Sequence, residues 1–211
     1  MNIATLTQFM ASADTSTELI EKLNFFLGKT LLTGHAESLI YLTHNSPKEV
    51  YSLSFWHSLE DLREFEKRWK TDLLMNPEFK AKPLSHHIFK LVWEFRLLTV
   101  PTIVSHLRLL TFPEKFSAQQ FHEKINSRRE EVKQVPGLIG AWLGVSTTNK
   151  AMALSRMDWS SLEALENFFN REVVQETVAQ YRAAGFIIEE VSFNLQGSTQ
   201  FDQPPRIRKF K

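Results

Sequence analysis

The chain has 211 residues, of which 43% are hydrophobic and 23% charged, a composition typical of a globular protein with one large or two small domains. Its 25 basic and 24 acidic residues leave a formal charge of +1, so neither nucleic acid nor an anionic membrane surface is expected as a partner. Cysteine is absent, which excludes disulfides, thiolate nucleophiles and cysteine-ligated metal sites. Because no leader peptide or membrane-spanning apolar stretch is evident, we expect a cytoplasmic protein.

The first half of the chain reads as strand, helix, strand, strand, helix, strand. A capping box at Thr15 and Glu18 predicts a helix that carries an apolar stripe and ends before Gly28. The motif helix after Trp56 has its apolar residues on one side. The strands are expected at residues 3–10, 38–43, 50–56 and 88–98.

The second half repeats this order after the junction at Pro101, a residue that would interrupt a central strand. A capping box at Ser117 and Gln120 starts a helix that ends near Pro136, and Ser160 is expected to cap a long helix that ends at Gly185. The strands are expected at residues 103–111, 138–145, 151–159 and 186–195.

One motif occurs twice, at residues 56–65 and 159–168, and each copy has Trp at the end of a strand and Ser at the start of a helix. A separation of 103 residues makes each copy part of a whole domain rather than of a solenoid unit. We therefore predict an α+β fold of two ferredoxin-like βαββαβ repeats. The boundaries are expected at residues 1–99 and 102–196, followed by a basic, proline-containing tail at 197–211.

Several predicted strands are apolar on both faces. In the strand at 88–98, Phe89 and Leu91 alternate with Ile88 and Val92. A sheet with two apolar faces must be buried on both, by its helices on one side and by the other repeat on the second side. The sequence thus predicts an intramolecular α+β barrel, present as a monomeric pseudo-dimer or a homodimer, with space for a small-molecule ligand between its sheets.

Three short segments carry a resemblance to a known family. They are Pro-Gly-Leu-Ile-Gly-Ala-Trp at 136–142, Trp-Ser-Ser-Leu-Glu-Ala-Leu at 159–165 and Ala-Ala-Gly-Phe at 183–186. The chain resembles the dimeric α+β barrels of the antibiotic-biosynthesis monooxygenase type, over nearly all of the second half and over residues 51–65 of the first. The resemblance implies this fold, whereas the activities of the family range from cofactor-free oxygenases to haem-degrading enzymes, dehydratases and members without known activity.

The haem-degrading branch has, by this resemblance, a Trp nine residues after the motif Trp and a His ten residues later. This chain has Phe65 and Met75 at those positions in one half, and Phe168 and Val178 in the other. Haem is therefore not expected, and no other cofactor is predicted.

His106 and Arg108 lie two residues apart on one strand and share a face, which we expect to point toward the other sheet. Arg156, on the neighbouring strand, is expected beside them. Together they are the candidate catalytic residues, since two buried arginines near a histidine would hold an acidic or enolate-like substrate. The alternative is a structural pair of Arg156 with Asp158 at the rim of the sheet.

The equivalent positions in the first half, at an offset near 100, are Leu6 and Gln8, so this half is expected to be a wall of the pocket. The predicted substrate pocket is aromatic and consists of Tyr51, Phe55, Trp56, Trp93 and Trp142. Aromatic strand residues are more often core than binding surface, which is the alternative for each of them.

No metal site is predicted. His86 and His87 are adjacent and point to opposite faces of a strand, so they cannot readily hold one ion together. Neither a phosphate-binding glycine loop nor a serine-hydrolase elbow occurs. The resemblance therefore favours a cofactor-independent monooxygenase for a small aromatic or anionic substrate, and the alternatives are a non-catalytic small-molecule binder or an interaction protein with a filled interior.

Overall fold

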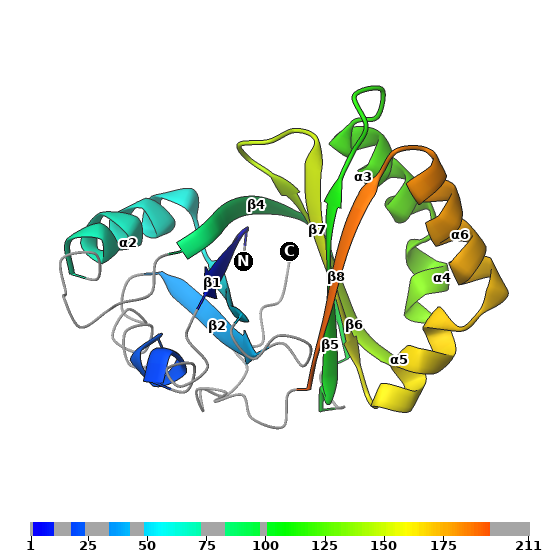
Figure 1. Cartoon of the computed structure of the whole chain (residues 1–211), viewed down its shortest axis with the longest axis horizontal. Coiled ribbons are helices and arrows are strands. Elements are labelled where there is room, and N and C mark those ends of the chain that lie inside the picture. The colour runs from blue at the N-terminus through cyan, green and yellow to red at the C-terminus, as the bar shows by residue number, and fades with distance from the viewer. Residues whose placement is uncertain are drawn as a thin grey trace, which may run out of the picture.

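The computed structural model describes residues 2–10, 18–23, 34–42, 49–72, 83–97 and 101–194 of the chain. Each half contributes four strands, and helices cover the outer side of each set of strands (Figure 1). The tail predicted at 197–211, Thr15 of the first predicted capping box, the end of the first helix and Met75 lie outside the described residues.

The eight strands form one antiparallel sheet in the order β2-β3-β1-β4-β6-β7-β5-β8. The strands of the first half are β1 (Ile3–Met10), β2 (His35–Leu42), β3 (Glu49–Trp56) and β4 (Pro83–Arg96). Those of the second are β5 (Val104–Thr111), β6 (Leu138–Ser146), β7 (Met152–Trp159) and β8 (Ile187–Asn194). Both halves have the same internal order, in which the first strand lies between the third and the fourth, and the pairing of β4 with β6 joins them.

The strand predictions are confirmed to within a few residues, except that β4 begins at Pro83 rather than near Ile88. This earlier start comes from pairing, because the β4 segment around His86 lies opposite β1, including Thr7 opposite His86. Hydrogen bonding to a neighbour stabilises a polar stretch that has little strand propensity of its own.

Residues 18–23 are helical, and the further helices are α2 (Leu59–Asp72), α3 (Ala118–Ser127), α4 (Arg129–Lys133), α5 (Leu162–Phe169) and α6 (Glu172–Ala183). The predicted capping box of Ser117 and Gln120 is present at α3. Each of the two long helices predicted for the second half is broken in two, at Arg128 and at Asn170–Arg171. The cap of α5 is Ser161, which accepts from the Ala164 N–H, and not Ser160 as predicted.

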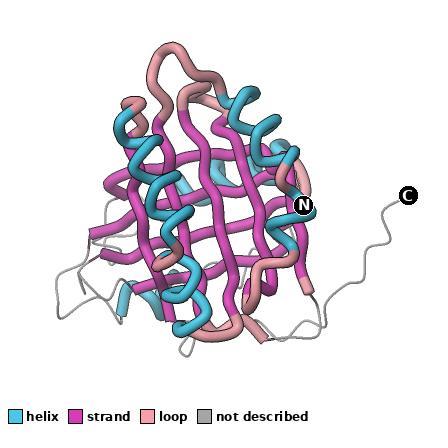
Figure 2. Tube along the Cα trace, turned by 90° about the vertical axis from the view of Figure 1, so that its right-hand side faces the viewer, coloured by secondary structure: helices cyan, strands magenta, loops and turns pink. Residues whose placement is uncertain are grey.

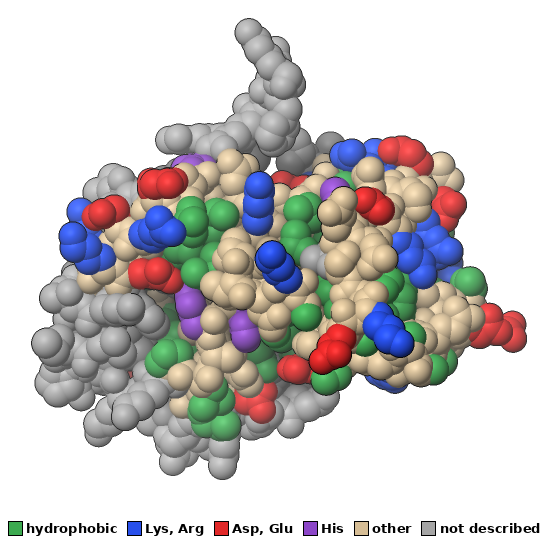
Figure 3. All heavy atoms as spheres, turned by 90° about the horizontal axis from the view of Figure 1, so that it is seen from above, with side chains coloured by type: hydrophobic (Ala, Val, Ile, Leu, Met, Phe, Trp, Pro, Cys, Tyr) green, Lys and Arg blue, Asp and Glu red, His purple; other side chains and the backbone are tan. Residues whose placement is uncertain are grey.

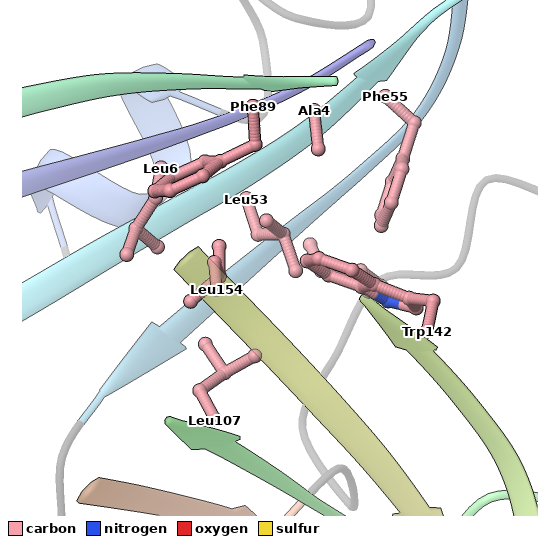
Figure 4. Close-up of a cluster of buried hydrophobic side chains, with 9 residues drawn as sticks. Ala4, Leu6, Leu53, Phe55, Phe89, Leu107, Trp142 and Leu154 are labelled. Carbon is pink, nitrogen blue, oxygen red and sulfur yellow. The ribbon is translucent and has the colours of Figure 1, made fainter. Parts of the chain in front are cut away.

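The sheet folds so that its two halves face each other. The helices of the second half lie outside their strands, and the strands of the first half run across behind them (Figure 2). The facing sides, called the inner faces here, share one buried cluster with members from both halves (Figure 4). Its residues are Ala4, Leu6, Leu39, Leu53, Phe55, Phe89, Leu107, Trp142 and Leu154. The predicted α+β barrel, with two ferredoxin-like halves packed sheet to sheet, is the fold of this chain.

The opposite sides, called the helix faces, pack against the helices. In the first half Trp56 and Ile3 pack on Leu62 of α2, and in the second half Trp159 packs on Leu165 of α5. Within the described ranges, no helix has the length and apolar character needed to cross a membrane. Basic, acidic and hydrophobic side chains are interspersed on the face seen from above, which agrees with the near-zero net charge (Figure 3).

Candidate functional site

A cavity of about 330 Å³ lies between the two inner faces. Its apolar lining comes mainly from the second half, and its polar lining mainly from the first. The lining residues are Leu6, Gln8, Tyr51, Ser85, His87, Leu107, Leu109, Met152, Leu154, Glu189 and Val191. This volume is near the lower end of the range for small-molecule sites, about 300 to 1,000 Å³.

Strand register explains which side chains reach the cavity. Gln8 of β1 lies opposite Tyr51 of β3 on one side and opposite Ser85 of β4 on the other. Residues directly opposite each other point to the same face of a sheet, so these three polar side chains form one row. His87, two residues after Ser85, continues the row and is paired with Leu6.

The polar row is held by hydrogen bonds. The Tyr51 hydroxyl donates to Glu49 Oε2 at 3.1 Å, and Gln8 Nε2 donates to the same oxygen at 3.5 Å. Ser85 Oγ donates to Gln8 Oε1 at 3.3 Å. The first-half wall of the cavity thus presents fixed dipoles and the Glu49 carboxylate close to Tyr51.

Burial and neighbouring carboxylates set the protonation of this wall. Burial, together with Glu49 and Glu189, raises the pKa of Tyr51 to about 12, so the phenol stays protonated at neutral pH. Burial and the neighbouring His86 lower the pKa of His87, whereas the Glu189 carboxylate acts in the opposite direction. His87 is therefore a neutral imidazole at neutral pH and has a lone pair available for a proton.

Arg156 lies on the inner face, as predicted, and is buried with 5% of its surface exposed. Its Nε donates to Asp158 Oδ1 at 2.7 Å, and Ser105, which is fully buried, donates to the same oxygen. The alternative pairing of Arg156 with Asp158 is thus present, although in the interior and not at a rim. Arg156 is not among the residues that line the cavity.

His106 and Arg108 point away from the other sheet, so the predicted orientation is wrong. Leu107 and Leu109 line the cavity, and the alternation of a strand places their neighbours on the helix face. There the Phe169 ring of α5 lies 4.6 Å from the His106 ring and 4.6 Å from the Arg108 guanidinium carbon. The three predicted catalytic residues therefore do not meet, because the sheet separates His106 and Arg108 from Arg156.

The His106 and Arg108 side chains form a polar cluster under α5 and α6. His106 Nδ1 lies 2.8 Å from Ser192 Oγ, and Arg108 Nε lies 2.6 Å from Glu190 Oε1. The adjacent His106 and Arg108 lower the pKa of Glu190 to about 2. This cluster ties β5 to the edge strand β8.

The predicted aromatic pocket is divided in the same way between the two faces. Tyr51 lines the cavity, and Phe55 and Trp142 meet edge to face beside it, with ring centroids 5.4 Å apart. Trp56 and Trp93 lie on the helix faces, so their predicted place in the pocket is wrong. Trp56 packs against α2, and Trp93 belongs to the core beneath the helices of the second half.

Sequence reasoning missed Ser85, His87 and Glu189 as site residues and gave Gln8 no role beyond that of a wall. From the sequence, His87 stands out only as a possible metal ligand together with His86. The sequence did contain a signal for His87. Alternate residues of a strand share a face, so His87 lies on the same face as Phe89, which belongs to the inner-face cluster.

Among the described residues, no group of three or more histidine, aspartate and glutamate side chains is placed to hold a metal ion. Two of the positions that mark haem degradation in the resembling family, Phe65 and Phe168, pack against the helix-face core here. Phe65 lies 4.6 Å from Trp56 and Phe168 lies 5.2 Å from Trp159, measured between ring centroids.

No family model and no curated protein matches this chain in sequence. Solved structures match it over nearly its whole length. A "putative monooxygenase" from Fusobacterium nucleatum has a TM-score of 0.69 and 13% identity, with 91% of each chain covered. An "anthrone oxidase-like protein" has a TM-score of 0.65 and 17% identity, with 92% of this chain and 90% of the other covered.

A ferredoxin-fold protein from Listeria monocytogenes, described as related to antibiotic biosynthesis monooxygenases, has a TM-score of 0.53 and 8% identity, with 92% and 95% of the chains covered. This chain shares their fold. At 8% identity the same fold also occurs in a heme-degrading enzyme of Listeria monocytogenes, with a TM-score of 0.55 and coverage of 90% and 98%. Identities this low establish the architecture, and chemistry has to be argued from the residues.

Proposed function

We propose that this protein is a cofactor-independent monooxygenase that oxidises a small, electron-rich aromatic substrate in the cavity between its sheets. The observation that carries the proposal is the cavity itself, which combines an apolar floor with the neutral base His87 on its polar wall. The names of the structural neighbours, a monooxygenase and an anthrone oxidase-like protein among them, favour the same chemistry.

The chemistry requires a substrate whose carbon gives up a proton to become electron-rich, such as the CH₂ group between the two aryl rings of an anthrone. His87 accepts this proton, and the Glu189 carboxylate stabilises the imidazolium that forms. Since the cavity floor is apolar, the resulting carbanion would be poorly hydrated, which favours electron transfer to dioxygen.

Atoms and electrons balance without an external reductant. The substrate C–H bond breaks, a C–O bond to dioxygen forms, and the imidazolium returns its proton to the peroxide to give a hydroperoxide. The remaining hydrogen of that carbon then leaves as a proton while the O–O bond breaks and hydroxide departs, so that the two leave together as water and a carbonyl group remains. One CH₂ group and one O₂ are thus converted into one C=O group and one H₂O.

The test is oxygen uptake by the purified protein with anthrone, corrected for autoxidation without protein. We expect one O₂ consumed for each anthraquinone formed. His87→Gln should lower the turnover number by about 100-fold or more, the usual contribution of a general base. His122→Gln, a substitution of the same kind on the outer helix α3, should leave the rate unchanged.

Oxidation of anthrone at the autoxidation rate, with or without binding, would reject the monooxygenase. Saturable binding of anthrone without oxygen uptake would instead favour the non-catalytic binding protein. A rate that His87→Gln does not change would place the chemistry outside this cavity.

A further inference from the structure

The charged side chain in the described lining of the inter-sheet cavity is a carboxylate, and a second carboxylate contacts the lining. Glu189 lies in the lining, exposed at the edge of the cavity, and Glu49 accepts the hydrogen bond of the cavity residue Tyr51 at 3.1 Å. Among the described lining residues there is neither lysine nor arginine. The nearest buried cation on the same face of β7, Arg156, is held by Asp158 at 2.7 Å.

We infer that the cavity binds the uncharged or cationic form of an aromatic hydrogen-bond donor and excludes aromatic carboxylates. This inference rests on the proposed function for the cavity as the binding site and specifies the class of its substrate. It replaces the anionic substrate expected from the sequence, since that expectation required His106 and Arg108 to lie on the inner face.

Desolvation increases the difference in affinity between a carboxylate ligand and an uncharged or cationic one. A carboxylate that enters a largely apolar cavity loses its hydration and gains no cation in exchange, while it approaches the carboxylates of Glu49 and Glu189. A hydroxyl or ammonium group of the ligand would instead donate to those carboxylates, and an ammonium would also be attracted to the Tyr51 ring.

The ionisation of the wall agrees with this selection. Burial raises the pKa of Tyr51 to about 12 together with the same carboxylates, which oppose a second negative charge near them. His87 is neutral at neutral pH and offers a ligand anion no countercharge. The substrate therefore enters protonated and loses its proton only to His87, inside the cavity.

The experiment compares three ligands of nearly equal shape at pH 7, by calorimetry on the full chain. They are 2-naphthol, 2-naphthylmethylammonium and 2-naphthoate. We expect 2-naphthoate to bind about tenfold or more weakly than 2-naphthol, as expected for one uncompensated charge interaction at an intermediate dielectric. The ammonium should bind at least as tightly as 2-naphthol.

Glu189→Gln should reduce the ratio of the affinity for 2-naphthol to the affinity for 2-naphthoate. Glu189→Lys should reduce this affinity ratio further or reverse the preference. Glu163→Gln, the same change on the exposed surface of α5, should leave the ratio unchanged. Equal or tighter binding of 2-naphthoate by the wild type, an unchanged ratio in both Glu189 variants, or no binding of any probe would overturn the inference.

These results are separate from the test of oxidation. Selective binding of the neutral and cationic probes by a protein that does not oxidise anthrone would support the ligand class and reject the monooxygenase. Oxidation of anthrone by a protein that prefers 2-naphthoate would support the monooxygenase and reject the ligand class.

Discussion

Two charged residues that point into the interior, Arg156 and Asp158, each have 5% of their surface exposed. A buried ion pair contributes little net stability, because desolvation offsets the attraction between its charges, but a single buried charge is costly. With Ser105 also bound to the carboxylate, this group belongs to the barrel interior as a neutral unit.

Removing one partner should therefore cost more than removing both. We predict that Asp158→Asn lowers the free energy of unfolding by about 3 to 5 kcal/mol, since it leaves the Arg156 charge uncompensated. The double variant Arg156→Met/Asp158→Leu should lie much closer to the wild type. Urea denaturation measures both, and a loss below about 1 kcal/mol for Asp158→Asn would mean that the pair is effectively solvated.

His35 gives the fold a sensitivity to mild acid. Its ring is buried against Trp56 with centroids 4.9 Å apart, and burial lowers its pKa to about 4. Above pH 6.5 neither the folded nor the unfolded state protonates this residue. As the pH falls from 6.5 to 4, His35 binds a proton in the unfolded state but not in the folded state. The free energy of unfolding therefore decreases.

We predict that the wild type loses roughly 1 to 3 kcal/mol more than His35→Gln across that interval. Urea unfolding at pH 7, 5.5 and 4 measures the difference. Parallel pH profiles for the two proteins would show that His35 is not the group responsible.

For single residues, the sequence indicated which side chains are buried and polar better than it indicated which face of the sheet they occupy. Arg156 was placed on the correct face, whereas His106 and Arg108 were placed on the wrong one. The apolar Leu107 and Leu109 line the cavity, so the polar residues that alternate with them face the helices. The equivalence of His106 and Arg108 with Leu6 and Gln8 is also off by one residue, since Ile3 and Val104 both pair with the motif Trp of their own half. The first strands are therefore offset by 101 residues and not 100, and a slip of one residue exchanges the two faces of a strand.

At the scale of elements, the ends of the helices and strands follow local chemistry closely. Gly137, before β6, adopts a φ of 78°, and the capping box of Ser117 starts α3 as predicted. The breaks at Arg128 and at Asn170–Arg171 were not predicted, because the apolar periodicity continues through both. Apolar spacing reports which side of a helix is buried and contains no information on where the axis bends.

Among these ends of helices and strands, Gly137 is predicted to tolerate substitution least. Alanine there would have to adopt a left-handed φ, and its Cβ would clash with the Cβ of Ala164 in α5. We expect Gly137→Ala to lower the unfolding free energy by about 2 kcal/mol or more. Adding Ala164→Gly should recover part of this loss by removing the clash, and full stability of Gly137→Ala alone would contradict the account.

At the scale of the whole molecule, each half provides the cover for the inner face of the other. The shared cluster includes Leu53 and Phe89 from the first half and Leu107 and Leu154 from the second. The two-sided apolar pattern of the strands predicted this arrangement. The cavity could not be predicted, because its volume depends on how side chains of two distant segments fit together.

Residues 1–101 alone should therefore self-associate. Without the second half, the first half would expose its inner face and the edge of β4, which normally pairs with β6. Size-exclusion chromatography with light scattering is expected to show dimers or larger species. A monomeric, cooperatively folding fragment would mean that the first half does not need the second half to bury its inner face.

If a ligand binds between the two sheets, a side chain that fills that space must prevent the binding. Leu109 lines the cavity and is only partly buried, so Leu109→Trp should occupy the space without disrupting the core. We predict that the affinity for 2-naphthol falls by tenfold or more, a loss of about 1.4 kcal/mol. The melting temperature should change by only a few degrees, and Leu109→Met, which nearly conserves volume, should bind normally. Undiminished binding by a folded Leu109→Trp protein would contradict the account and place the ligand elsewhere.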